Sequence, residues 1–134
     1  MKLLTTRYNS GAFNLALLLL RLGFGILIVH HGYDKLIHFS MYETRFVSFL
    51  GLSANVSLGL VVFAEFFGGI LIILGLLTRL ACIPLIITMA VALFKAHSGD
   101  FFGMGEMATL YLTAYVVLLL TGPGRISVDG MIGK

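Results

Sequence analysis

The chain has 134 residues, of which 59% are hydrophobic and 11% charged, and its mean hydropathy is +1.04. Soluble domains carry about 25% charged residues, so this composition excludes an ordinary soluble domain and predicts one integral membrane domain over residues 1–134. The net charge of +3 is more typical of basic membrane loops than of nucleic-acid binding. A single cysteine, Cys82, excludes an intramolecular disulfide and a CxxC redox pair within this chain.

Four apolar runs predict an all-α fold, a four-helix bundle that spans the membrane. Each run is close to the ~20 residues that a helix needs to cross a bilayer, and the fourth is slightly short. We expect the first run to be a retained span rather than a cleaved signal, because Arg21 interrupts it. The runs cover approximately residues 12–33, 54–77, 80–96 and 104–121.

The segment between the first two spans, IHFSMYETRFVSFLGLSAN, has a different pattern. Phe39, Tyr42, Phe46 and then Phe49 or Leu50 recur at steps of three or four residues. That spacing predicts a short amphipathic helix lying at the membrane surface.

The basic residues divide unequally between the two sides that four spans would create. One side has five and the other has three together with four acids. Because cytoplasmic loops carry the excess of Lys and Arg, both termini are predicted to be cytoplasmic, in the cytoplasmic (inner) membrane. The richer side holds Lys2, Arg7, Arg79, Arg125 and Lys134, and the poorer side holds Lys35, Arg45 and Lys95.

Two charged residues lie in the middle of apolar runs. Charges inside a membrane are costly and mark candidate functional sites. Arg21 lies ~14 Å and Glu65 ~18 Å from the cytoplasmic ends of their spans, at 1.5 Å per residue. These similar depths on neighbouring antiparallel spans predict an Arg21–Glu65 contact.

A polar cluster is predicted around these two residues, open to the outer face. On a helical wheel Arg21 shares one face with Gly32 and Lys35, while His31 lies at its flank and His30 on the far side. His97 and Glu106 follow at the outer ends of the third and fourth spans, and Glu106 shares one predicted polar face of the fourth span with Thr109 and Thr113. The predicted catalytic residues are Glu65, His31 and Glu106, and the predicted ligand-binding residues are Arg21, Lys35 and His97. No metal site is predicted, because the histidines lack ligand spacing.

Three stretches, LLRLGFGILIVHHGYDKL, AEFFGGILIILGLLTRLA and LLLTGPGRISVD, together resemble the DoxX family of small bacterial membrane proteins. The resemblance covers nearly the whole chain and implies a four-helix bundle in the cytoplasmic membrane. It also implies redox chemistry, since the family name comes from a subunit of thiosulfate:quinone oxidoreductase and other members are linked to oxidative-stress complexes. The residues that match its signature positions are Arg21, His31, Gly32, Lys35, Glu65, Gly68, Gly69, Arg79 and residues 122–125.

These observations leave three functions open. A quinone-binding membrane subunit would use Arg21 or His31 as donors to the quinone and Glu65 or Glu106 as proton carriers. It would take its electrons from a redox partner protein or a bound cofactor. A binder or transporter of a small anionic or amphipathic molecule would use Arg21 as the counter-charge, with Lys35 at the entrance. An assembly subunit would use the charges as a clamp. The expected surroundings are the lipid bilayer and a homo-oligomer.

Overall fold

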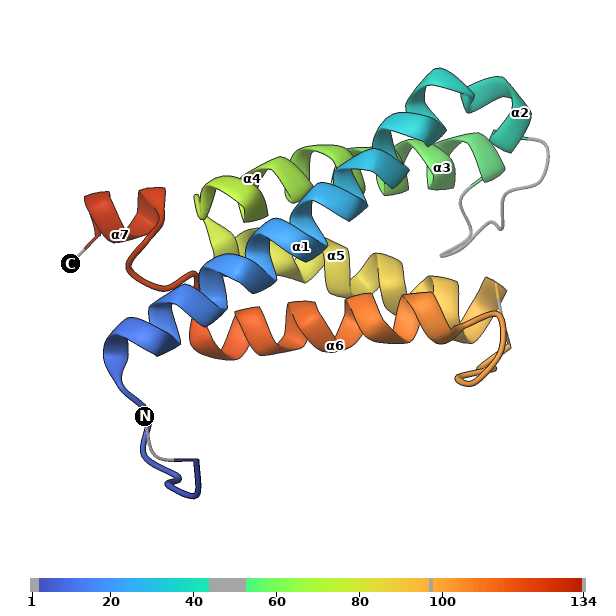
Figure 1. Cartoon of the computed structure of the whole chain (residues 1–134). Helices are drawn as coiled ribbons and strands as arrows, with labels where there is room; N and C mark the ends of the chain where they lie inside the picture. Colours follow the sequence, from blue (N-terminus) through green and yellow to red (C-terminus); the bar gives the residue numbers. More distant parts are fainter. Residues whose placement is uncertain (1–2, 44–52, 97, 134) are drawn as a thin grey trace.

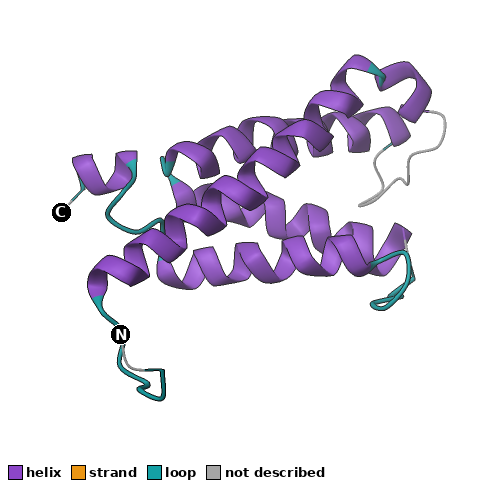
Figure 2. Cartoon of the chain, viewed as in Figure 1, coloured by secondary structure: helices purple, strands orange, loops and turns teal. Residues whose placement is uncertain are grey.

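The computed structural model describes residues 3–43, 53–96 and 98–133, and every element within them is helical. Figure 2 shows the described chain as helices joined by short loops. The elements are α1 (Ser10–Ile37), α2 (Phe39–Glu43), α3 (Ala54–Val62), η1 (Phe63–Gly68), α4 (Gly69–Leu74), α5 (Thr78–Val91), η2 (Ala92–Ala96), α6 (Glu106–Thr121) and α7 (Val128–Ile132).

Three continuous helices in the described part of the chain are long and apolar enough to cross a membrane: Ser10–Ile37, Ala54–Leu74 and Thr78–Lys95. The second consists of α3, η1 and α4 without a break. The fourth predicted span forms α6, which has 16 residues and is therefore ~24 Å long. The all-α prediction is confirmed, with these rods side by side (Figure 1). A bundle in which all four cross the bilayer remains a prediction.

The first helix is longer than the predicted run of residues 12–33. It begins at Ser10 because the Asn9 side chain accepts a hydrogen bond from the Ala12 amide at 2.8 Å, an ordinary N-terminal cap. After α1, the five-residue α2 is tied back by Tyr42, whose hydroxyl donates to the Asp34 carboxylate at 2.5 Å. The rest of the predicted amphipathic helix, residues 44–52, lies outside the described residues.

The turn between α4 and α5 shapes one end of the molecule. Gly75 ends α4 in the left-handed conformation, with φ of 69°, which glycine adopts without strain. A Cβ there would also lie 2.3 Å from the Ser127 Cβ and 2.9 Å from the Arg21 guanidinium. Glycine is therefore required both by the turn and by the segments that pack on it.

Small residues bring α1 into direct contact with η1 and α4. A Cβ on Gly32 would lie 2.6 Å from the Phe66 backbone nitrogen, and one on Gly25 would lie 2.7 Å from Ile73 Cγ1. On the other helix, a Cβ on Gly69 would lie 2.6 Å from Val29 Cγ2. Small residues at such interfaces let helices approach closely in lipid. They set the register, with Gly32 beside the turn that contains Glu65.

Gly32→Ala should lower the stability of the protein by about 1–3 kcal/mol, the usual cost of overpacking, because its Cβ would meet backbone rather than a movable side chain. Gly23→Ala is the matched control on the same helix, since a Cβ there has no neighbour within 4 Å. By helix propensity alone the control should be stabilised by up to ~1 kcal/mol. Thermal unfolding midpoints in detergent compare the two variants, and equal midpoints would contradict this packing.

Candidate functional site

Arg21 is buried, with 2% of its surface exposed, and it binds backbone carbonyls. Its Nε donates to Ile72 O at 3.1 Å and its Nη2 to Ile73 O at 3.0 Å. Its Nη1 donates to Pro123 O at 3.0 Å and to Ile126 O at 2.6 Å. The first two carbonyls belong to the last turn of α4, where the helix itself leaves carbonyls short of partners. Ile72 O also accepts from the Gly75 amide at 3.2 Å. Arg21 thus joins α1, the end of α4 and the segment after α6.

The predicted Arg21–Glu65 contact is wrong. The depths of Arg21 and Glu65 are counted from the cytoplasmic ends of their spans, and they correspond only if these ends lie at the same level in the membrane. Instead α1 extends past the end of α4, where Asn14 Oδ1 accepts a hydrogen bond from the Arg125 amide at 2.9 Å. The resulting shift, about two helical turns at 3.6 residues per turn, places Arg21 beside Ile72 and Ile73 rather than beside Glu65.

Glu65 pairs with Lys35 instead, with 2.7 Å between Oε1 and Nζ. The Glu65 side chain is 3% exposed and that of Lys35 is 22% exposed. Glu65 lies in the π-helical segment η1, and single π-helical turns inside α-helices occur frequently at functional sites. Lys35 is in the last turn of α1. A buried carboxylate thus meets a cation that remains partly accessible.

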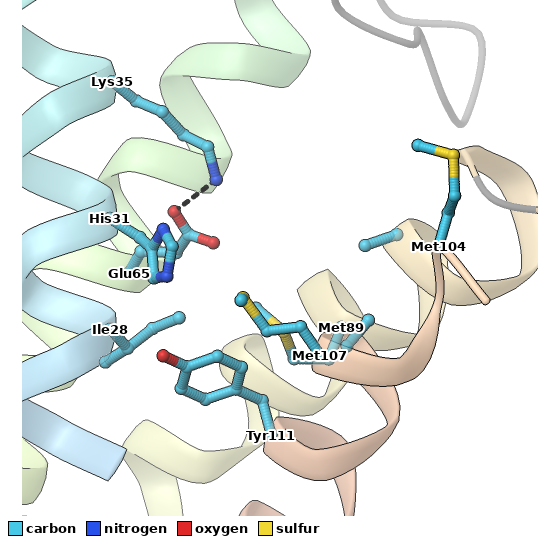
Figure 3. Close-up of a pocket in the computed structure, with 10 residues that line it drawn as sticks. Ile28, His31, Lys35, Glu65, Met89, Met104, Met107 and Tyr111 are labelled. Carbon is cyan, nitrogen blue, oxygen red and sulfur yellow. Dashed lines mark hydrogen bonds and ion pairs between the residues drawn. The ribbon is translucent and has the colours of Figure 1, made fainter. Parts of the chain in front are cut away.

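A cavity of about 260 Å³ opens beside this pair. Figure 3 shows the Lys35–Glu65 pair at one wall, the His31 ring next to it and the Tyr111 hydroxyl pointing toward α1. The His31 and Tyr111 rings meet edge to face, with 6.0 Å between centroids. Polar groups therefore lie on one side of a mostly apolar space. The lining residues are Ile28, His31, Lys35, Glu65, Met89, Ala92, Met104, Met107, Ala108 and Tyr111.

The cavity brings together three of the six predicted site residues: His31, Lys35 and Glu65. Arg21 does not line it, and Glu106 is exposed in the first turn of α6. His97 lies outside the described residues. His30 is exposed on the opposite side of α1, as the helical wheel predicts. Within the described part of the chain, no group of three His, Cys, Asp or Glu side chains could hold a metal ion.

Tyr111 lines the cavity, although it is not among the residues predicted for the site. The expected polar face of α6 ran through Glu106, but Tyr111 lies five residues further, about 140° around the helix at 100° per residue. The buried face of α6 is the one with Tyr111 and Tyr115. The four-residue spacing of these two tyrosines was the available signal, and their stacked rings lie 6.0 Å apart.

Comparison with known proteins matches residues 16–98 to the DoxX family. An uncharacterized protein of Haemophilus influenzae is 30% identical over 122 residues, which are 86% of this chain and 89% of that protein. An uncharacterized membrane protein of Mycobacterium tuberculosis is 38% identical over 80 residues, 49% of each chain. No solved structure matches the chain significantly.

Arg21→Lys should lower the unfolding midpoint markedly, because one ammonium group cannot reach carbonyls on both sides of the guanidinium. Each buried group that loses its partner costs about 1–3 kcal/mol. The segment after α6 should also become more accessible to protease, since two of the four bonds hold it. Arg79→Lys is the control, because exposed Arg79 makes one 3.4 Å contact. Equal behaviour of the two variants would contradict the assigned role of Arg21.

Lys35→Met should destabilise the protein more than the double variant Lys35→Met/Glu65→Gln. The single change leaves a buried carboxylate without a cation, whereas the double change removes both charges. A double-mutant cycle on unfolding free energies should give a coupling of about 0.5–3 kcal/mol. Additive effects of Lys35→Met and Glu65→Gln would show that the 2.7 Å pair contributes nothing.

Proposed function

This chain belongs to the DoxX family of membrane proteins, and we propose that it binds the head group of a quinone in the cavity beside Glu65, as the membrane subunit of a redox complex. The carrying observation is the charge balance of that cavity. Its cation, Lys35, is already paired at 2.7 Å with its carboxylate, Glu65. A neutral head group with hydrogen-bond acceptors suits such a site better than an anion does.

The donors fit a quinone. An ammonium carries three N–H donors, and within the described residues the Lys35 ammonium makes one hydrogen bond, to Glu65. His31 and Tyr111 add a ring nitrogen and a hydroxyl at the same wall. Ile28 and Met89 provide apolar surface for the ring, and a few placed polar groups in a mostly apolar cleft are typical of small-molecule sites.

Proton transfer is the chemistry that the chain itself would supply. A quinone accepts electrons and protons together, so its reduction needs a donor acid within hydrogen-bond reach. Glu65 is the candidate, because Lys35 holds its carboxylate at the cavity wall and the carboxylate becomes a donor acid once it takes up a proton from a neighbouring group. The Lys35 ammonium and the His31 ring lie next to that carboxylate (Figure 3) and would supply this proton. The electrons would come from a redox partner protein.

The anion-binding alternative loses its main support in this geometry. It required Arg21 as the counter-charge, but Arg21 makes four bonds to carbonyls and does not line the cavity. Lys35 is the one cation among the described lining residues, and Glu65 compensates its charge. Binding an anion there would leave an excess negative charge in a partly buried site.

We place the protein in the cytoplasmic membrane, with both termini cytoplasmic. Arg7 precedes α1, Arg79 is in the first turn of α5 and Arg125 follows α6. Figure 1 shows the starts of α1 and α5 and the end of α6 at the end of the molecule where both chain termini are found. The positive-inside rule assigns that end to the cytoplasm. The cavity and Lys35 lie toward the other end and would open to the outer half of the membrane. Exposed apolar side chains such as Leu19, Leu80 and Leu120 would face lipid, and a homo-oligomer is compatible with this arrangement.

Native mass spectrometry of the detergent-solubilised protein, titrated with decylubiquinone, tests the proposal. His31→Phe should weaken binding about tenfold or more, as expected for the loss of a hydrogen bond worth ~1.4 kcal/mol. His30→Phe is the matched control, because His30 is exposed on the far side of α1 and binding should not change.

Equal affinity of the two histidine variants would contradict the site. Tighter binding of dodecanoate than of decylubiquinone, lost in His31→Phe, would instead support the anion-binding alternative.

A further inference from the structure

A second groove lies at the opposite end of the molecule, where α1 and α5 begin and α6 ends. It encloses about 750 Å³ and is lined by Asn14, Arg79, Thr121, Arg125 and Asp129, together with the backbone around Pro123. An adjoining depression shares Arg79, Thr121, Pro123 and Asp129 with it. We propose that this groove binds the phosphate of an anionic membrane phospholipid, through Arg79 and Arg125.

The two arginines are available for an anion. Neither has an ion-pair partner in the described part of the chain, where the ion pairs are Lys35–Glu65 and His38–Asp34. Arg79 makes a single side-chain bond, a long one of 3.4 Å to Leu120 O. Both side chains are exposed. Guanidinium groups bind phosphate in a forked, charge-assisted geometry. By contrast, the Nε, Nη1 and Nη2 atoms of the structural Arg21 all donate to backbone carbonyls.

The one carboxylate among the described residues of the groove already accepts hydrogen bonds from the backbone. Asp129 Oδ1 accepts from the Leu77 amide at 2.9 Å, and Oδ2 accepts from the Thr78 amide at 3.2 Å. These amides stand at the start of α5, where the helix dipole stabilises negative charge. Asp129 thus serves as the cap of α5, and the groove keeps a net positive character from Arg79 and Arg125.

Thr78 is a polar residue next to the groove, but it does not carry the proposal. It lines the depression that adjoins the groove, and its Oγ1 is the buried side-chain atom without a hydrogen-bond partner among the described residues. Because Thr78 is fully buried, the two exposed arginines make the contact with the phosphate. A lipid is the favoured source of that phosphate, because the groove lies at the end of the membrane-crossing helices and basic pockets there bind anionic headgroups.

Delipidated full-length protein in detergent, titrated with dioleoylphosphatidylglycerol or dioleoylphosphatidylcholine and followed by native mass spectrometry, tests this proposal. The protein should bind phosphatidylglycerol about tenfold more tightly than phosphatidylcholine. Arg79→Gln and Arg125→Gln should each weaken phosphatidylglycerol binding about tenfold, as expected for a charge-assisted contact. Arg7→Gln, which removes an exposed charge just before α1, should change it less than about twofold.

Three results would overturn the proposal. Equal losses in Arg7→Gln and in the two groove variants would show general surface attraction. Inorganic phosphate or glycerol 3-phosphate that binds as tightly as phosphatidylglycerol and displaces it would show a site for a soluble phosphate. If Arg125→Gln fails to fold, Arg125→Lys replaces it and should still weaken phosphatidylglycerol binding several-fold by losing the guanidinium fork. Unchanged binding of phosphatidylglycerol to Arg125→Lys would then show that Arg125 does not bind the phosphate, which overturns the proposed site.

Discussion

The buried guanidinium of Arg21 is the contact on which one end of the molecule depends. Its four bonds connect α1 to the last carbonyls of α4 and to the segment that follows α6. That segment then continues to Asp129, which caps α5. Carbonyl groups without partners are especially costly where water is absent. An arginine satisfies several of them at once, because its donors are spread over a planar fork.

This attachment of α1 has a consequence at the other end of the helix. With Arg21 held at the end of α4 and Gly32 packed against the backbone of η1, the last turn of α1 brings Lys35 to Glu65. The two cations of α1 therefore have separate roles. Arg21 closes helix ends, whereas Lys35 balances the carboxylate that makes a polar site inside an apolar bundle. The close contact between α1 and η1 and the cavity beside Glu65 therefore both depend on the same alignment of α1 along the second long helix.

The sequence predicted much of this arrangement and failed at identifiable points. Apolar runs predicted the three long helices, and residue identity marked Glu65, His31 and Lys35 as neighbours of one site, which the cavity brings together. The Arg21–Glu65 pairing failed because depth was counted from helix ends, and those ends are offset. The glycines at 25, 32 and 69 indicate the alignment of the two helices better, because each lies where the backbone of one helix is in close contact with the other helix.

The orientation of α6 was the second failure, and its cause is different. Its acid and threonines suggested a polar inner face, but in a membrane protein hydroxyls can bond within their own helix, as Thr109 and Thr113 do with the carbonyls four residues before them. Polarity alone therefore did not identify the buried side. Tyr111 and Tyr115 did, because large aromatic rings need the space that the core provides.

Photolabelling with an azido-quinone, followed by mass-spectrometric mapping of the modified residues, tests the central claim most directly, because it locates the bound head group. Labelled peptides are expected from the last turns of α1, from η1 and from the start of α6 around Tyr111, and excess decylubiquinone should suppress the labelling. Labelling confined to lipid-facing residues, or to the groove of Arg79 and Arg125, would contradict the assignment of the cavity beside Glu65.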